Sequence, residues 1–361
     1  MCRELINKIK LFKAVVPVKN KISDATHTLE EVSFLVLRIT TKSGVTGEGY
    51  LLCFQYSPYA IVGAVKDFME LVKTYSIWET GKFNIEALIE DEYFGHTGLL
   101  NWARCLFNIA MWDIKGKILG LPIQKIFGVN RDKVPIYGSG GWLSYSIDEL
   151  ISEVSDYKER GFRAVKIKVG SPDWKTDLFR LRQVRQAVGE DVNIMMDANQ
   201  GMNTIDAVQL SLAAKDLNIY WFEEPVHHQD FDGYRKIKDC SGIALAMGER
   251  EFDTVALREL LLRNAIDIWQ PDLLRLGSVE AWRESTALAS SFHIPVMPHY
   301  YKDYDVPLLC TIPNGVGAES FDWIDPLIDY PIKIEDGFAY PHERPGWGFS
   351  FLDEFLEEIK L

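Results

Sequence analysis

The stretch Arg163-Ala-Val-Lys166-Ile-Lys168-Val-Gly170 has the β-branched, apolar character of a short buried strand, yet it carries two lysines. Side chains two positions apart on a strand point to the same face, so Lys166 and Lys168 are expected to lie side by side. Mutual repulsion and lost hydration both lower the pKa of a lysine, which suits a base that works near neutral pH. Taken alone, the stretch fits a solvated surface pair equally well.

The surrounding residues repeat a strand-then-helix pattern. Ser146, Asp253 and Ser278 mark helix starts, and Gly161 and Gly189 stand where helices should end. Short apolar strands are expected at residues 134–137, 164–169, 193–196, 219–222, 244–247, 266–269, 295–297 and 316–318. Strands buried on both faces in such a series predict an α/β fold with a closed parallel barrel. An open doubly wound sheet is the alternative, but residues 138–141 lack the GxGxxG spacing expected after its first strand.

The first 130 residues follow a different pattern. Strands are expected at 9–18, 33–40 and 47–54, and helices at 59–74, 84–91 and 99–119. Strands followed by segregated helices predict a separate α+β domain. Two intervening loops, 19–29 and 55–59, concentrate polar and aromatic residues. Such loops either lie idle in solvent or fold over a site.

The composition narrows the class of protein. With 47% hydrophobic and 25% charged residues, the chain is neither disordered nor fibrous. A net charge of -13 without any basic run argues against a nucleic-acid partner. The five cysteines are scattered and never form a CxxC pair, as expected for reduced thiols in a cytoplasmic protein. No signal-peptide core or run of about 18 apolar residues occurs, so no membrane partner is expected.

Polar residues follow the expected strands where a barrel places its functional groups, at the carboxyl ends. Any one of them has an ordinary explanation as a cap or loop residue, but six matching ends in succession do not. The residues are Asp197-Ala-Asn199, Glu223-Glu-Pro225, Gly248-Glu249-Arg250, Gln270-Pro-Asp272, Pro298-His299 and Glu319.

Three of the acidic residues at these ends come from successive units of the barrel. Asp197, Glu223 and Glu249 would repel one another strongly on one face unless a cation lay between them. Hard oxygen ligands with open coordination positions suit Mg²⁺. The alternative is that each carboxylate is paired separately with a basic residue.

Two bases are expected to flank this cluster. Lys168 faces it from the second strand, and His299 faces it from the seventh, on the other side of the barrel mouth. Asp272 is placed to hydrogen-bond the imidazole and to fix its tautomer. Bases beside a metal suit removal of the weakly acidic proton next to a carboxylate. Lys166 and Glu319 are positioned to contact the second carboxylate oxygen.

These motifs together resemble the enolase superfamily, and within it the mandelate racemase subgroup. The resemblance implies an α+β capping domain over residues 1–130 and a modified TIM barrel of the (β/α)7β type over residues 131–330. A C-terminal segment, residues 331–361, packs back on the capping domain. It also implies Mg²⁺ held by Asp197, Glu223 and Glu249, with Lys168 and the His299–Asp272 pair as bases. Lys166 and Glu319 hold the substrate carboxylate, and relatives of this kind form homo-oligomers.

The loops of the capping domain then become lids that select the substrate. Their polar side chains suit a polyol chain, and residues 336–348 resemble dehydratases that act on galactarate-type diacids. We therefore expect an acid-sugar dehydratase, a lyase that forms a 2-keto-3-deoxy acid from a small carboxylate. A racemase or epimerase using the same bases is one alternative, and a non-catalytic binding protein is another. The expected substrate-binding residues are Lys21, His27, Tyr56, Asn199 and Arg275.

Overall fold

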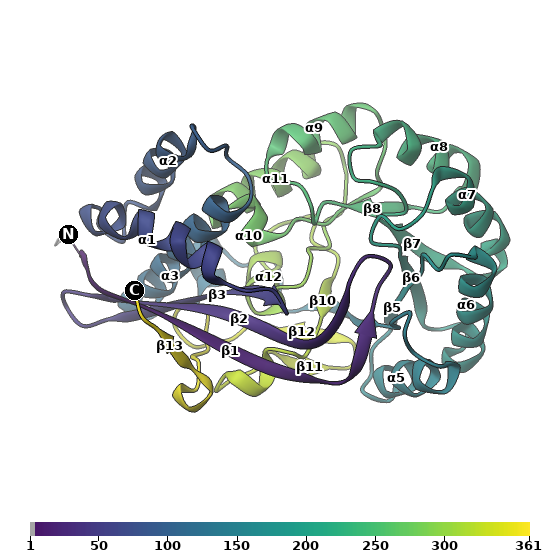
Figure 1. Ribbon diagram of the computed structural model, residues 1–361, viewed down its shortest axis with the longest axis horizontal. Coiled ribbons are helices and arrows are strands. Elements are labelled where there is room, and N and C mark those ends of the chain that lie inside the picture. Colours follow the sequence, from purple (N-terminus) through teal and green to yellow (C-terminus); the bar gives the residue numbers. More distant parts are fainter. Residues whose placement is uncertain (1–3) are drawn as a thin grey trace.

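The computed structural model describes residues 4–361, which form an antiparallel sheet with helices beside a closed barrel (Figure 1). The sheet has the order β13-β1-β2-β3. Its strands are β1 (Ile6–Ser23), β2 (Thr28–Thr41), β3 (Thr46–Phe54) and β13 (Glu357–Ile359), and the helices beside it are α1 (Tyr59–Thr74), α2 (Thr80–Asp91) and α3 (Leu99–Leu119). The last strand of the chain therefore completes the first sheet.

Helix α3 is buried along most of its length, and it packs closely on β3 at two glycines. A Cβ on Gly47 would lie 2.3 Å from the Ala110 carbonyl oxygen, and one on Gly49 would lie 2.8 Å from that of Leu106. Only glycine allows the helix backbone to approach this closely. The packing fixes the start of β3 on the helix, and the strand runs from there toward the barrel (Figure 1).

The barrel strands are joined in parallel in the order in which they occur in the chain. They are β4 (Val134–Gly140), β5 (Ala164–Lys168), β6 (Asn193–Asp197), β7 (Ile219–Glu223), β8 (Leu245–Met247), β9 (Ile268–Trp269) and β10 (Ala318–Ser320). Val296 bridges Trp269 to Gly315, and β10 pairs with β4, which closes the ring. The predicted barrel is confirmed and the open sheet is excluded.

Helices cover the outside of the barrel, one or two after each strand except the last, which gives the (β/α)7β order. They are α5 (Ile147–Glu159), α6 (Trp174–Val188), α7 (Thr204–Ala213), α8 (Phe231–Ser241), α9 (Thr254–Leu262), α10 (Leu273–Leu276), α11 (Val279–Ser291) and α12 (Lys302–Leu309). The helix starts predicted at Ser146, Asp253 and Ser278 are confirmed, since each side chain accepts a hydrogen bond from the first turn.

Several predicted boundaries are wrong. The seventh strand is reduced to the single bridging residue Val296, because Pro295 and Pro298 on either side lack the backbone N–H that a ladder needs. The last strand lies later than predicted and includes Glu319. Helix α2 begins at Thr80 instead of residue 84. The predicted loop 19–29 is mostly hairpin, since β1 runs to Ser23 and β2 begins at Thr28.

The C-terminal segment contacts both parts of the molecule. Strands β11 (Lys333–Glu335) and β12 (Phe338–Tyr340) form a hairpin that pairs with the start of β4. The Trp347 indole then donates to the Ile109 carbonyl at 3.0 Å, and β13 pairs with β1. The predicted return of the chain onto the first sheet is thus seen, while the division at residues 130 and 330 stays a prediction.

Helix α12 ties β3 to the barrel through tyrosine hydroxyls. The backbone N–H of Tyr50 donates to the Tyr304 hydroxyl at 3.0 Å, and that of Leu52 donates to the Tyr301 hydroxyl at 3.2 Å. The Tyr50 hydroxyl in turn donates to Asp303 Oδ2 at 3.3 Å. Because α12 begins three residues after His299, these contacts hold the mouth of the barrel against the first sheet.

The buried carboxyl of Asp303 makes stability depend on pH. Burial raises its pKa to about 7, although the charge of Lys302 opposes the rise. An unfolded aspartate titrates near pH 4, so the folded chain loses stability as pH rises from about 4 to 7. We expect Asp303→Asn to raise the free energy of unfolding by about 2 kcal/mol at pH 8 and to lose this advantage below about pH 4. Urea unfolding at both pH values measures it, and a variant less stable than the parent at pH 8 contradicts it.

Candidate active site

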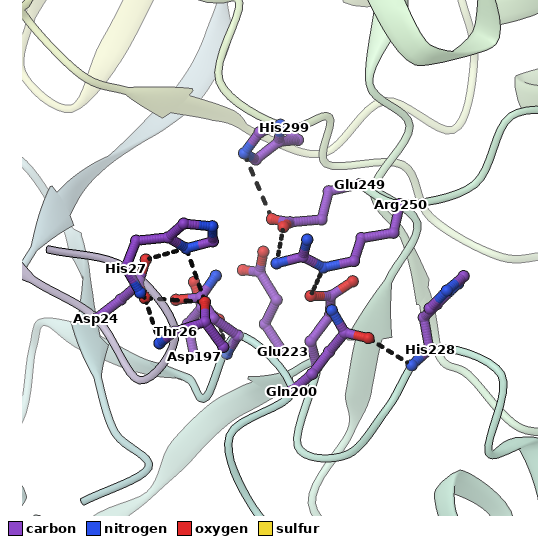
Figure 2. Close-up of polar contacts among 12 residues, drawn as sticks. Asp24, Thr26, His27, Asp197, Gln200, Glu223, His228, Glu249, Arg250 and His299 are labelled. Carbon is purple, nitrogen blue, oxygen red and sulfur yellow. Dashed lines mark hydrogen bonds and ion pairs between the residues drawn. The ribbon is translucent and has the colours of Figure 1, made fainter. Parts of the chain in front are cut away.

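Three acidic side chains gather at the carboxyl ends of neighbouring strands. Asp197 ends β6 and Glu223 ends β7, and the two residues are direct partners in the parallel register. Glu249 follows β8 by two residues. Figure 2 shows Glu223 between Asp197 and Glu249, with all three side chains directed toward one space. The predicted convergence of these acids is therefore present.

Two buried lysines lie on one side of this acidic cluster. Lys168 Nζ lies 2.6 Å from Asp197 Oδ2 and 2.9 Å from Asn199 Oδ1. Lys166 Nζ lies 2.8 Å from Glu223 Oε2 and 2.5 Å from Glu319 Oε1. Both lysines come from β5, which is the neighbour of β6 in the barrel.

The expected lowering of the lysine pKa is wrong for this arrangement. Burial by itself lowers the pKa of Lys166, but the charges of Glu223 and Glu319 outweigh it and raise that pKa well above its usual value. Burial also lowers the pKa of Lys168, and Asp197 reverses the effect. Each ammonium group has a carboxylate within ion-pair distance, so attraction exceeds the repulsion between the two lysines.

An imidazole lies at the opposite end of the acidic cluster. His299 Nδ1 lies 2.8 Å from Asp272 Oδ2, and His299 Nε2 lies 3.4 Å from Glu249 Oε2. The other oxygen of Asp272 accepts the backbone N–H of Arg275 at 3.0 Å, which fixes the carboxylate. Burial lowers the pKa of His299, but Glu249 and Asp272 outweigh it and raise that pKa.

The donor set fits a hard divalent cation. Glu223 Oε1 is fully buried and has no hydrogen-bond partner, so this carboxylate has an oxygen available for a metal. Arg250 holds Glu249 in place, with Nη2 3.4 Å from Glu249 Oε1 and Nε 3.0 Å from Glu224 Oε2. Within residues 4–361, no three His, Cys, Asp or Glu side chains are already arranged as a complete metal site. The acids instead lie against Lys166, Lys168, Arg250 and His299.

A cavity of about 350 Å³ opens above these groups. Four of the five predicted substrate-binding residues line it: His27, Tyr56, Asn199 and Arg275. The fifth, Lys21, is not among the lining residues; it pairs with Glu30 at 3.0 Å on the exposed part of the hairpin. The lining also includes Lys166, Lys168, Glu249, Asp272, His299 and Glu319.

Sequence reasoning missed Phe321 and Trp323, which form an aromatic wall with Trp142 on one side of the cavity. The ring of Trp323 stacks on Phe321 at 4.6 Å and on Trp142 at 5.9 Å between centroids. Lys168 Nζ lies 5.4 Å from the centre of the Trp142 ring. An aromatic side chain in a strand or loop has the same appearance in a sequence whether it lines a cavity or fills the core. No pattern in the sequence marks these residues.

The tip of the β1–β2 hairpin reaches from the sheet to the barrel (Figure 1), and its Asp24 and His27 line the cavity. The backbone N–H of Leu143 donates to the Ser23 carbonyl at 2.7 Å, which docks the tip on the barrel. The methyl group of Ala25 lies in a seat formed by Gly170 and Gly201, where added Cβ atoms would lie 2.9 Å and 2.3 Å from Ala25 Cβ. The two glycines therefore set how closely the tip approaches the site.

Filling this seat is expected to weaken substrate binding. Gly201→Ala places a methyl group 2.3 Å from Ala25 Cβ and forces the tip outward. We expect kcat/KM to fall by about tenfold or more, mainly through KM, because small misplacements of positioning groups are costly. Steady-state kinetics of the variant measures this loss.

A second substitution tests the cause of that loss. Ala25→Gly removes the clashing methyl group. The added Cβ then lies at an ordinary 3.6 Å from the Ala25 Cα and at a tighter 3.1 Å from the Ala198 carbonyl oxygen. The double variant should recover most of the activity. Equal activity of the single and double variants would show that the seat does not control the hairpin tip.

Comparisons with known proteins agree with this architecture. The model "Mandelate racemase / muconate lactonizing enzyme, N-terminal domain" matches residues 7–128, and "Enolase C-terminal domain-like" matches residues 149–355. The L-talarate/galactarate dehydratase of Salmonella typhimurium is 28% identical over 97% of this chain and 89% of its own. The D-galactarolactone cycloisomerase of Agrobacterium fabrum is 34% identical over 74% of this chain and 76% of its own.

A solved structure extends the likeness to three dimensions. The crystal structure of the Salmonella typhimurium dehydratase, liganded with Mg and L-lyxarohydroxamate, superposes with a TM-score of 0.93 at 27% identity. The match covers 99% of this chain and 95% of that chain. The fold and the family models therefore agree that the chain belongs to the enolase superfamily, in the mandelate racemase and muconate lactonizing enzyme family.

Proposed function

We propose that this protein is a Mg²⁺-dependent acid-sugar dehydratase, a lyase that removes water from a sugar-derived carboxylate. The observation that carries the proposal is the placement of Lys168 and the His299–Asp272 pair at opposite ends of one acidic cluster, inside one cavity. Reactions of this class need a base for the α-proton and an acid for the departing hydroxyl group. The dehydratases among the relatives support the choice of reaction.

Asp197, Glu223 and Glu249 would hold the cation through carboxylate oxygens. When bound, Mg²⁺ supplies positive charge that stabilises the enediolate left by removal of the α-proton. Its charge also offsets the carboxylates that raise the lysine pKa, which favours a neutral lysine as a base. Solved relatives carrying Mg support the choice of ion.

The side chains of this chain account for the rest of the reaction. Lys166 holds the substrate carboxylate, and Glu319 donates a hydrogen bond to it when protonated. The neutral amine of Lys168 takes the α-proton. The electron pair of that C–H bond enters the enediolate, and it then forms the double bond between the α- and β-carbons as the β-hydroxyl leaves. The His299 imidazolium gives that oxygen a proton, so it departs as water. The resulting enol tautomerises to a 2-keto-3-deoxy acid.

A screen of acid sugars tests the proposal directly. We expect one or more members of a panel of galactarate-like diacids and aldonic acids to yield a 2-keto-3-deoxy acid in Mg²⁺ buffer. Colorimetric detection of the product suffices. A panel without product and without any incorporation of solvent deuterium into the substrate would contradict both the dehydratase and the use of these bases.

A racemase or epimerase is the second candidate, because the same two bases lie on opposite sides of one cavity. Deuterium and inverted configuration in recovered substrate, without keto acid, would favour it. A binding protein without catalysis is a poorer fit. Sequence drift after loss of catalysis usually removes at least one of the expected catalytic residues, and none is missing here.

The expected homo-oligomer stays a prediction. No helix within residues 4–361 is long and apolar enough to cross a bilayer.

A further inference from the structure

The turn at the tip of the β1–β2 hairpin is held by hydrogen bonds to one of its own side chains, Asp24. Asp24 Oδ1 accepts the backbone N–H groups of Thr26 and His27, each at 2.6 Å, and the Thr26 hydroxyl at 3.0 Å. Asp24 is an anion, because the hydrogen bond from His27 and the charge of Lys168 outweigh burial and lower its pKa to about 2. An ionised carboxylate that binds its own turn in this way holds the conformation of the next residues.

This turn also fixes the tautomer of His27. Thr26 Oγ1 lies 2.7 Å from His27 Nδ1 while donating its own proton to Asp24 (Figure 2). Asp24 Oδ2 lies 3.4 Å from the same nitrogen. A carboxylate and a hydroxyl oxygen whose proton is already donated both require a hydrogen on Nδ1. In the neutral ring, His27 Nε2 is consequently without a proton and accepts hydrogen bonds.

The ring is held where a substrate chain would pass. His27 lines the cavity, stacks on Phe54 with centroids 5.8 Å apart and meets the edge of Tyr56 at 6.4 Å. Figure 2 shows it on the opposite side of the acidic cluster from Arg250. The reacting groups come from the barrel, whereas His27 comes from the hairpin tip seated by Ala25. Its position suits the part of a substrate beyond the reacting carbons.

We infer that His27 determines specificity by accepting a hydrogen bond, through Nε2, from a hydroxyl group on the distal chain of the acid sugar, and that Thr26 and Asp24 position it. The inference rests on the proposed function and narrows its substrate class. The distal chain must present a hydroxyl donor to the hairpin tip. A substrate carboxylate at the hairpin tip is disfavoured, because it has no proton to donate to His27 Nε2 and lies near the anion Asp24.

Comparing long and short substrates tests the inference. Galactarate and gluconate carry distal hydroxyl groups, whereas glycerate has the same α- and β-carbons and no distal chain. His27→Phe keeps a ring against Phe54 but has no acceptor. We expect it to lower the ratio of kcat/KM for the better long substrate to kcat/KM for glycerate by about tenfold, the effect of losing one hydrogen bond. Exchange of the α-proton with solvent deuterium measures its removal from each substrate.

A matched pair of variants tests the positioning role. Thr26→Val removes the hydroxyl group without changing the volume and should lower the same ratio by about threefold. Thr26→Ser should restore it. Thr28→Val makes the same change at an exposed position two residues along the hairpin and should leave the ratio unchanged.

The outcomes separate the two proposals. If the parent enzyme neither exchanges the α-proton of any probe nor turns any probe over, the proposed function is wrong. If the parent processes glycerate and a long substrate, but His27→Phe lowers both equally or neither, the specificity role of His27 is wrong. A ratio that falls as far in Thr26→Ser as in Thr26→Val overturns the positioning role of the Thr26 hydroxyl.

Discussion

Lys168→Ala is expected to lower turnover by about 10³-fold, in the range found for removal of a general base. Its amine lies 2.6 Å from Asp197 and borders the cavity, with no other lysine except Lys166 in the lining. Lys166 is engaged by Glu223 and Glu319, so it is not free to replace the lost base. The variant should neither form the keto acid nor exchange the α-proton with solvent deuterium.

His299→Asn should fail at a different step. Turnover is expected to fall by a similar factor of about 10³, because the acid for the departing hydroxyl group is lost. The α-proton should still exchange with solvent, since Lys168 is intact. Mass spectrometry of recovered substrate distinguishes the two variants. In a racemase, by contrast, each variant would exchange the α-proton of only one stereoisomer.

A surface lysine provides the control for both variants. Lys236 is exposed on α8, so Lys236→Ala should keep full activity. Full activity of Lys168→Ala and His299→Asn on every isomer would refute the assignment of the two bases. Similar exchange in both variants would refute the division of labour between them.

The barrel was predictable because its evidence is local. The polar residues directly follow the carboxyl end of each strand. Once the strands are identified, Asp197, Glu223 and Glu249 are therefore expected at the same end of the barrel. The charge state of the lysines was not predictable in this way. It depends on Asp197, which lies on the neighbouring strand, and on Glu319, which lies far along the chain from Lys166. Neighbours of this kind appear only when the strands are paired.

The substrate side of the cavity was predicted less well, for a physical reason. Polar residues in a loop suggest a site, which is why His27 and Tyr56 were found, but they do not show which way a hairpin turns its side chains. Lys21 lies on the exposed arm beside Glu30. The aromatic residues Phe321 and Trp323 gave no signal, because burial in a core and exposure to a cavity both favour large apolar side chains.

Removal of divalent cations is the second large expected effect. EDTA should lower turnover by about 10³-fold or more, because several kcal/mol of charge stabilisation are lost with the metal, and added Mg²⁺ should restore it. The same cation should stabilise the fold, since it binds the acidic cluster of the folded chain and not the unfolded chain. At 100 times its dissociation constant, Mg²⁺ raises the free energy of unfolding by about 2.7 kcal/mol.

This stabilisation gives a measure of the site that does not depend on finding the substrate. Glu249→Gln removes one proposed ligand charge and should abolish most of the Mg²⁺-dependent rise in melting temperature. Glu251→Gln removes the same charge two residues later, on a carboxylate that pairs with His228 at 2.7 Å outside the cavity lining, and should retain the rise. Equal responses of the two variants to Mg²⁺ would mean that the acidic cluster does not hold the ion. The assignment of Lys168 as a base then loses its basis as well, because without a cation the carboxylates beside it keep its pKa raised and its amine protonated.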